Sequence, residues 1–187
     1  MGVNPPLKGR SVFLDRDGVI NLAYIRDGKP YPPKSISEFV VLPKVREALV
    51  NLSASGWLLI VITNQPDVAR GTLSREAVEE INRFMLAELP IVNIKTCYHD
   101  NRELCLCRKP KPGALLEAAR EYDIDLSSSY MVGDRWRDIE AGKNAGCKTI
   151  FIDNNYNEKR PIAPDYTVKN LPEASNIILG KKDEKNN

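Results

Sequence analysis

The sequence predicts an α/β fold of the Rossmann-like kind, in which a parallel sheet carries helices on both faces. Short apolar runs typical of buried strands begin near residues 11, 57, 94, 130 and 148. The stretches between them repeat apolar residues at helical spacing, so strands and helices alternate along the chain. The length of 187 residues suits one domain. A parallel sheet gathers the carboxyl ends of its strands at one edge, where ligands bind.

The individual elements follow from local signals. Strands are expected at 11–14, 57–62, 94–98, 130–132 and 148–152. Helices are expected at about 43–56, 74–90, 112–122 and 138–145, and a loop rich in Pro, Gly and Lys at 21–34. Ser74 is the expected N-cap of the second helix, and Pro90 ends it. We expect an N-terminal arm at 1–10, one domain at 11–179 and a flexible charged tail at 180–187.

The charge balance argues against binding to nucleic acid or to a membrane. Lys and Arg number 27 against 25 acidic residues, which gives a net charge of +2 and little electrostatic attraction to polyanions. The longest apolar run, Trp57 to Ile62, is far shorter than the roughly 20 residues that span a bilayer. The first ten residues lack the apolar stretch of a secretory signal, so we expect a cytoplasmic protein.

Polar segments follow the predicted strands at 11–14, 57–62 and 130–132. A basic segment lies between the second and the third of these polar segments. In chain order they read FLDRDGVIN, VITN, RKPKPG and VGDRWRD. An Asp-x-Asp pair after a strand is also common in simple turns, so Asp15 and Asp17 alone are a weak signal. The ordered set of four is far more specific, because parallel topology would bring all of these segments to one edge of the sheet.

This ordered set resembles the haloacid dehalogenase-like (HAD-like) phosphatase superfamily over roughly residues 11–152. The further combination of LDRDGVIN, TNQ, ARG, a C-x-H and C-x-C loop, and CRKPKPG is similar to one branch of it. That branch contains D-glycero-D-manno-heptose 1,7-bisphosphate phosphatase and the phosphatase domain of histidinol-phosphatase. Its members have little or no cap domain, and the length of this chain fits such a minimal cap.

The resemblance implies a role for each aspartate. Asp15 would be the nucleophile that forms an aspartyl-phosphate, and Asp17 would protonate the leaving alcohol and later accept a proton from water. A carboxylate that attacks a phosphate needs a divalent ion to offset their repulsion. Mg²⁺ suits an all-oxygen site made of Asp15, the Asp17 backbone carbonyl and Asp134.

Further residues would hold the substrate. Thr63, Asn64 and Lys109 suit the oxygens of the transferred phosphate, and Gln65 would line the same pocket. By the match to the family, Arg108, Lys109 and Arg135 are expected to bind the substrate. Asp138 leaves two interpretations open: it either assists the metal or orients a neighbour, or it is exposed or caps a helix.

Three of the four cysteines and the only histidine lie within eleven residues, which we call the zinc loop (97–107). Cys97, His99, Cys105 and Cys107 suit a closed tetrahedral Zn²⁺ site. A disulfide is the weaker alternative, since it leaves His99 unexplained. With four protein ligands such a zinc ion has a structural role and would aim Arg108 and Lys109 at the site. Cys147 is expected to be a buried thiol.

These expectations describe a Mg²⁺-dependent phosphomonoesterase that acts on a small sugar phosphate. The favoured reaction is removal of the C7 phosphate of D-glycero-D-manno-heptose 1,7-bisphosphate. The alternatives are histidinol-phosphate hydrolysis, a promiscuous small phosphatase, and a zinc-stabilised binding module without catalysis. A site complete within one chain favours a monomer.

Overall fold

The computed structural model describes residues 9–181. Nearly all of the expected N-terminal arm (1–10) and most of the expected tail (180–187) lie outside these residues. Among the described helices, none has the length and apolar character that crossing a membrane requires.

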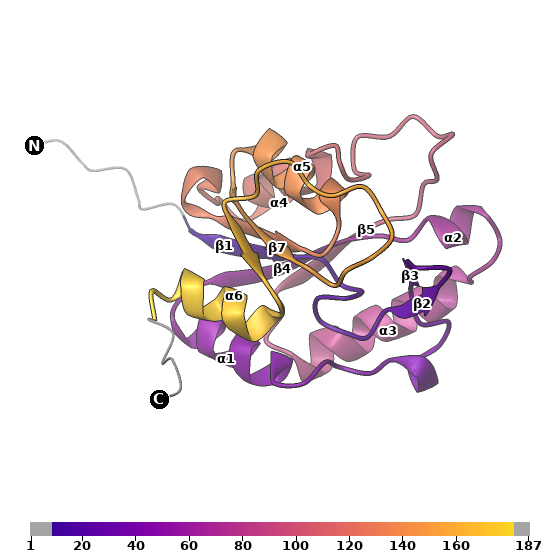
Figure 1. Ribbon diagram of the computed structural model, residues 1–187, viewed down its shortest axis with the longest axis horizontal. Coiled ribbons are helices and arrows are strands. Elements are labelled where there is room, and N and C mark those ends of the chain that lie inside the picture. Colours follow the sequence, from indigo (N-terminus) through magenta and orange to yellow (C-terminus); the bar gives the residue numbers. More distant parts are fainter. Residues whose placement is uncertain (1–8, 182–187) are drawn as a thin grey trace, which may run out of the picture.

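The centre of the molecule is one six-stranded parallel sheet, as the sequence predicts (Figure 1). Its strands are β1 (Ser11–Leu14), β4 (Leu58–Asn64), β5 (Asn93–Cys97), β6 (Tyr130–Gly133), β7 (Lys148–Ile152) and β8 (Tyr166–Val168). Their spatial order is β5-β4-β1-β6-β7-β8. The five expected strands are confirmed, and β8 is an addition at the edge.

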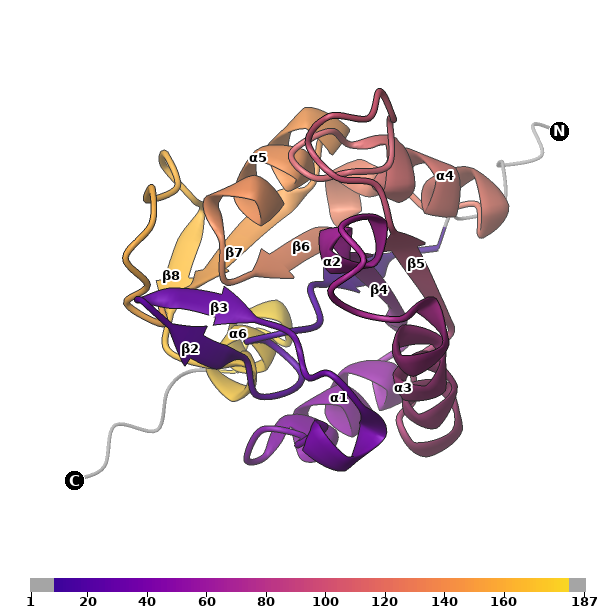
Figure 2. The same ribbon diagram turned by 90° about the vertical axis from the view of Figure 1, so that its right-hand side faces the viewer.

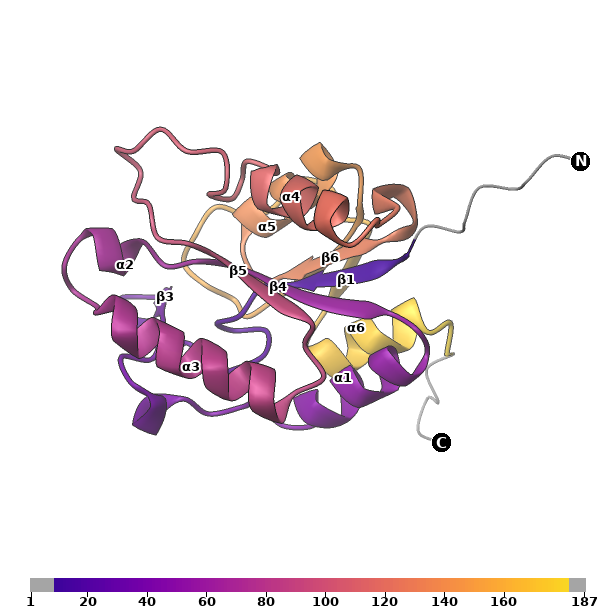
Figure 3. The same ribbon diagram turned by 180° about the vertical axis from the view of Figure 1, so that it is seen from behind.

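Helices cover both faces of the sheet (Figures 1 and 3). On one side lie α1 (Val45–Ala54), α3 (Arg75–Glu88) and α6 (Leu171–Ile178), and on the other α4 (Gly113–Glu121) and α5 (Trp136–Ala145). Alternate residues of β1 serve the two layers, because successive side chains of a strand point to opposite faces. Val12 and Leu14 pack with the first group of helices, and Phe13 packs with the second. Ser74 caps α3 as expected, since its hydroxyl accepts from the Ala77 N–H.

The carboxyl ends of the central strands form the edge that faces the viewer in Figure 2. Strand β1 lies between β4 and β6, so the segment after it is flanked by the segments that follow both neighbours. The topology thereby places Asp15, Thr63 and Asp134 at adjacent strand ends, although they are far apart in sequence.

The segments above this edge are short. The expected loop at 21–34 contains a hairpin instead, formed by β2 (Tyr24–Arg26) and β3 (Lys29–Tyr31). The one-turn helix α2 (Pro66–Ala69) follows β4, and the zinc loop follows β5 (Figure 2). The 3-10 turns η1 (Ile36–Glu38) and η2 (Leu126–Ser128) complete the described elements. Between residues 9 and 181 no inserted segment forms a separate cap, in agreement with the expected minimal cap.

Candidate active site

Lys109 lies at the centre of a buried charge cluster. Its Nζ is 2.8 Å from Asp15 Oδ1 and 2.7 Å from Asp138 Oδ1, and all three side chains are almost wholly buried. Asp15 follows β1, and its backbone N–H donates to the carbonyl of Val132 on β6 at 2.9 Å. The cation therefore links the residue after β1 to a residue in the first turn of α5.

Burial and charge act against each other in this cluster. Burial raises the pKa of Asp15 to about 6, although the nearby Lys109 ammonium opposes this rise. Burial alone would lower the pKa of Lys109, but the carboxylates of Asp138 and Asp15 outweigh it and raise that pKa. Lys109 thus keeps its positive charge although its side chain is almost wholly buried.

Asp138 combines two of the roles that the sequence left open. Its Oδ1 pairs with Lys109, and its Oδ2 accepts from the Arg135 N–H at 2.9 Å, which caps the start of α5. The side chain is 2% exposed, so the exposed interpretation is excluded. Gly133 permits this packing, because a Cβ there would lie 2.1 Å from the Cβ of Asp138.

Asp134 is buried beside this cluster with its two oxygens in different situations. Oδ2 accepts from the Tyr156 hydroxyl at 2.7 Å and from Asn154 Nδ2 at 3.2 Å. Oδ1 is buried and has no hydrogen-bond partner among the described residues. Burial raises the pKa of Asp134 well above its ordinary value, and the carboxylates of Asp15 and Asp138 raise it further.

The carboxylates of Asp15, Asp134 and Asp138 fit a small divalent cation. Oxygen atoms from the three side chains lie within 4.8 Å of one another. A buried carboxylate oxygen without a donor is costly unless something positive binds it. The donor set is entirely oxygen, which Mg²⁺ prefers.

Asp17 is held by three side chains. Its Oδ1 accepts from Asn21 Nδ2 at 2.9 Å and from Arg16 Nε at 3.2 Å. Its Oδ2 accepts from Gln65 Nε2 at 2.8 Å and from the Arg16 guanidinium at 3.1 Å. Because both oxygens already accept, Asp17 has to give up at least one of these bonds before it can donate a proton to a substrate.

The residues after β4 have roles that the sequence did not reveal. Gln65 is fully buried, and besides Asp17 it donates to the Thr63 hydroxyl at 2.9 Å. The sequence predicts that Gln65 lines the phosphate pocket, and the structure places its side chain behind Asp17. The Asn64 side chain accepts from the Lys109 N–H at 3.1 Å and donates to the Lys109 carbonyl at 3.0 Å.

A cavity of about 300 Å³ opens above Asp15. Its acidic wall residues are Asp15, Asp17, Asp67 and Asp138, and its basic ones are Lys29, Arg70, Arg108, Lys109, Arg135 and Arg137. The hairpin β2–β3 and α2 supply parts of the wall. Cations outnumber carboxylates, so the cavity suits an anionic ligand. Thr63, Gln65 and Asp134 are buried and do not line it.

The arginines of this wall differ in their partners. Arg135 and Arg137 both pair with Glu158, at 2.7 Å and 2.8 Å. Arg108 instead donates to the His99 carbonyl at 3.0 Å and to Asn101 Oδ1 at 3.1 Å. Burial lowers the pKa of Arg108, and the like charges of Arg137 and Arg70 lower it too. These guanidiniums are therefore close enough to repel one another, and an anion between them would relieve the repulsion.

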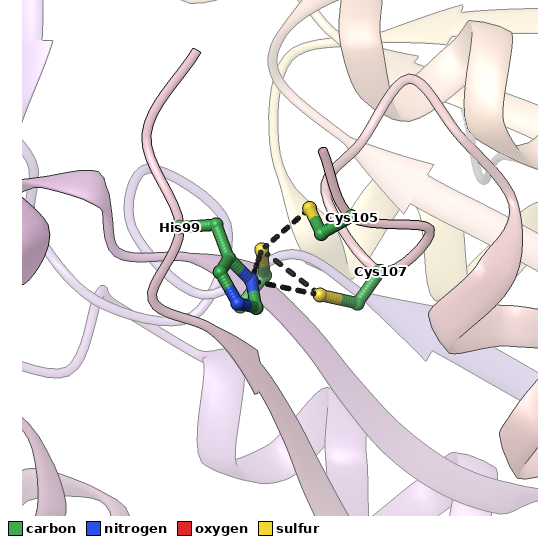
Figure 4. A group of neighbouring side chains, drawn as sticks. His99, Cys105 and Cys107 are labelled. Carbon is green, nitrogen blue, oxygen red and sulfur yellow. Dashed lines mark hydrogen bonds between the residues drawn. The ribbon is translucent and has the colours of Figure 1, made fainter. Parts of the chain in front are cut away.

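The zinc loop brings its four expected ligands together (Figure 4). Cys97 Sγ is 3.2 Å from Cys107 Sγ, 3.9 Å from Cys105 Sγ and 3.5 Å from His99 Nδ1. In a tetrahedral zinc site with Zn–S bonds of about 2.3 Å, neighbouring sulfurs are about 3.8 Å apart. All four cysteines of the chain are free thiols, so the disulfide alternative is not realised.

The chain is similar to proteins that are named as heptose-bisphosphate phosphatases. The chain is 33% identical to a D-glycero-beta-D-manno-heptose-1,7-bisphosphate 7-phosphatase of Pasteurella multocida, across 92% of this chain and 98% of that protein. The chain belongs to the heptose-bisphosphate phosphatase family of HAD-like hydrolases. A D-glycero-alpha-D-manno-heptose-1,7-bisphosphate 7-phosphatase of Campylobacter jejuni is 35% identical, across 94% of this chain and 99% of that one. Residues 106–174 also match a family model described as HAD-hydrolase-like.

Solved structures of the family agree with the fold. The D,D-heptose 1,7-bisphosphate phosphatase of B. bronchiseptica, complexed with magnesium and phosphate, superposes with a TM-score of 0.74 at 27% identity. The superposition covers 92% of this chain and 99% of that one. A HAD-like phosphatase of Mesorhizobium loti gives the same TM-score at 26% identity, across 100% and 93% of the two chains.

Several contacts that shape the site were not predicted from the sequence. Arg16, Asn21 and Gln65 hold Asp17, while Tyr156 and Asn154 hold Asp134. Three further residues of the cavity wall were also not predicted. They are Lys29 of the β2–β3 hairpin, Arg70 and Arg137. The ARG segment that contains Arg70 was part of the family resemblance, but it gave no indication that this guanidinium faces the cavity.

Proposed function

We propose that this HAD-like phosphatase removes the C7 phosphate of D-glycero-D-manno-heptose 1,7-bisphosphate through an aspartyl-phosphate on Asp15. The observation that supports this most is the distribution of charge in the cavity. A nucleophilic carboxylate and a buried ammonium lie at its floor, and further cations lie along its wall. A substrate with a phosphate at each end matches this arrangement, and the named activity of the relatives agrees.

Each residue of the floor has a defined task in this reaction. An oxygen of Asp15 attacks the phosphorus, and the bond between phosphorus and the C7 oxygen breaks. Asp17 donates a proton to that oxygen, so the sugar leaves as an alcohol. Water then attacks the phosphorus of the aspartyl-phosphate, and Asp17 accepts a proton from it. Inorganic phosphate leaves, and Asp15 is restored.

Charge stabilisation comes from several directions. Lys109 stays protonated and lies beside Asp15, where negative charge develops on the transferred group. Mg²⁺, held by Asp15, Asp134 and the Asp17 backbone carbonyl, would neutralise phosphate charge and orient it for attack. Thr63 lies beneath the floor of the cavity, where its hydroxyl accepts from Gln65. The backbone N–H of the next residue, Asn64, suits a phosphate oxygen.

The zinc loop would act as a scaffold for the substrate side. Four protein ligands leave Zn²⁺ no open position, so it takes no part in hydrolysis. Because the carbonyl of the ligand His99 accepts from Arg108, the metal would fix this guanidinium on the cavity wall. Arg108 and Arg70 then suit the second phosphate, since forked guanidinium donors match phosphate oxygens.

The remaining expectations also stay proposals. We propose a single domain at 11–179 that works as a monomer, because residues of one chain suffice to bring the nucleophile and the cations of the cavity together. Thiolates that hold a metal need a reducing compartment, which favours the cytoplasm. Neither nucleic acid nor a membrane is needed for the proposed reaction.

Phosphate release from a panel of substrates tests this function. The panel contains both anomers of the heptose 1,7-bisphosphate, histidinol phosphate and hexose phosphates, each with Mg²⁺ and with excess EDTA. We expect Mg²⁺-dependent release with a strong preference for one heptose anomer, and at least a 10³-fold loss in Asp15→Asn, on the order of the effect of removing a nucleophile. A preference for histidinol phosphate would replace the proposed substrate, and full activity of Asp15→Asn would overturn the mechanism.

A further inference from the structure

Two residues of the loop between β7 and β8 contact the carboxylate expected to bind Mg²⁺. Tyr156 donates its hydroxyl to Asp134 Oδ2 at 2.7 Å, and Asn154 Nδ2 lies 3.2 Å from the same oxygen. Asn154 Nδ2 also lies 3.0 Å from the Tyr156 hydroxyl oxygen. We propose that Tyr156 and Asn154 are positioning residues, which fix Asp134 so that its other oxygen is presented to the metal.

The two carboxylate oxygens of Asp134 differ in their hydrogen bonds. Every hydrogen bond to the Asp134 side chain goes to Oδ2, while Oδ1 is buried without a partner among the described residues. A carboxylate free to rotate would exchange its oxygens and satisfy either one. Here two donors hold one oxygen, so the orientation of the unpartnered oxygen is set by the protein. A metal ligand that is prearranged in this way loses less entropy on binding.

The loop after β1 also packs against Asp134 and Tyr156. Gly18 has a φ of +86°, and a Cβ there would lie 1.9 Å from Asp134 Oδ2 and 2.6 Å from the Tyr156 hydroxyl. The Gly18 carbonyl also accepts from Asn154 Nδ2 at 3.0 Å. Asn154 therefore ties the loop that carries Asp15 and Asp17 to the loop after β7. The position of Asp134 is fixed from both loops at once.

Tyr156 does not touch the substrate cavity, which separates its role from that of a catalytic residue. It is absent from the cavity wall above Asp15 and contacts the site through Asp134. Its removal should therefore act on metal affinity and leave the chemical step intact once the metal is bound. Hydrogen bonds to metal-ligating groups typically contribute 10- to 100-fold in affinity.

The inference rests on the proposed Mg²⁺ site, and the experiment distinguishes the two. Thermal unfolding of the purified, zinc-loaded protein is followed over a range of MgCl₂ concentrations without substrate, and the rise in midpoint gives the Mg²⁺ affinity. Asp134→Asn is expected to abolish the rise. If the parent protein shows no rise, the proposed metal site fails. If the parent and Asp134→Asn behave as expected, the positioning role is tested by the next variants.

Tyr156→Phe keeps the ring and removes only the hydroxyl. We expect its apparent Kd for Mg²⁺ to rise about 10-fold or more, with kcat at saturating Mg²⁺ within threefold of the parent. Asn154→Ala should weaken Mg²⁺ in the same direction, and it carries the test if Tyr156→Phe does not fold. Tyr122→Phe is the matched control, because the Tyr122 hydroxyl bonds to Asn93, far from this cluster, at 2.8 Å.

A folded Tyr156→Phe that binds Mg²⁺ as tightly as the parent and the Tyr122→Phe control would overturn the proposal. If the kcat of that variant also stayed low at saturating Mg²⁺, Tyr156 would be a participant in the chemical step.

Discussion

The side-chain amide of Asn64 binds both backbone polar groups of Lys109, accepting from the N–H at 3.1 Å and donating to the carbonyl at 3.0 Å. This pairing joins the end of β4 to the segment after the zinc loop. It fixes the backbone from which the Lys109 side chain extends to Asp15. A residue expected to bind phosphate directly thus also sets the position of the Lys109 ammonium.

Loss of this pairing should slow the reaction. In Asn64→Ala, Lys109 can move relative to Asp15, and a displacement of about 1 Å can cost on the order of 10²-fold in rate. We expect kcat to fall about 10- to 100-fold. In Asn64→Asp, kcat should fall at least as much, because a carboxylate oxygen replaces the donor and faces the Lys109 carbonyl. A rise in KM without a change in kcat would show that Asn64 acts on substrate binding instead.

Removal of the buried cation should destabilise the protein as well as inactivate it. Lys109→Met leaves the buried carboxylates of Asp15 and Asp138 facing each other without the cation between them. The loss of one partner of a buried ion pair typically costs about 3–5 kcal/mol. We expect a fall of that size in the free energy of unfolding, measured with urea. Adding Asp138→Asn to this variant should restore part of it, and no recovery would contradict the assigned repulsion.

Binding of the second phosphate should depend on Arg70 and Arg108 of the cavity wall. Arg70→Ala and Arg108→Ala are each expected to raise KM for the bisphosphate about 10-fold, the size of a lost charge-assisted hydrogen bond. For a sugar that carries only the C7 phosphate, KM should change little. The control is Arg83→Ala, an exposed position on α3. Equal effects on both substrates would place these arginines at the reacting phosphate.

Thiol chemistry should separate the buried cysteines from the partly exposed ones. Burial raises the pKa of the Cys147 thiol to about 12, and because a neutral thiol reacts poorly, the reactivity of Cys147 should rise with pH. After zinc is removed with a chelator, we expect the partly exposed Cys105 and Cys107 to react quickly with a disulfide reagent. Cys97 and Cys147 are buried and should react only on unfolding. Rapid reaction of Cys147 in the folded protein would contradict this.

Apolar runs and turn residues made the central sheet predictable. Strands β1, β4, β5, β6 and β7 carry buried or partly buried stretches, and the motifs at their ends resemble a known family. The three-residue strands β2, β3 and β8 are mostly exposed, so no alternation marks them. The expected helices did not include α6, although the sequence carries a signal for it. The Asn170 side chain caps this helix, and apolar residues follow at helical spacing.

The site was predictable where chemistry is tied to a motif, and not where it depends on distant loops. Asp15, Lys109 and Asp134 stand in recognisable segments, and the ligands of the zinc loop are close in sequence. Tyr156 and Glu158 lie in an irregular stretch whose residues repeat at no regular spacing. Their contacts with Asp134 and with Arg135 and Arg137 cross more than twenty positions and arise only from the packing of that loop.

The order of strands in the sheet has a consequence for synthesis of the chain. Strand β1 emerges first from the ribosome but takes the middle of the sheet, and its second neighbour, β6, comes more than a hundred residues later. The Ser11 N–H, for example, donates to a hydroxyl 118 residues away. A growing chain that ends before β6 has one side of β1 without a partner and lacks Asp134. Such late pairing slows folding, and it delays the phosphatase site until most of the protein has been made.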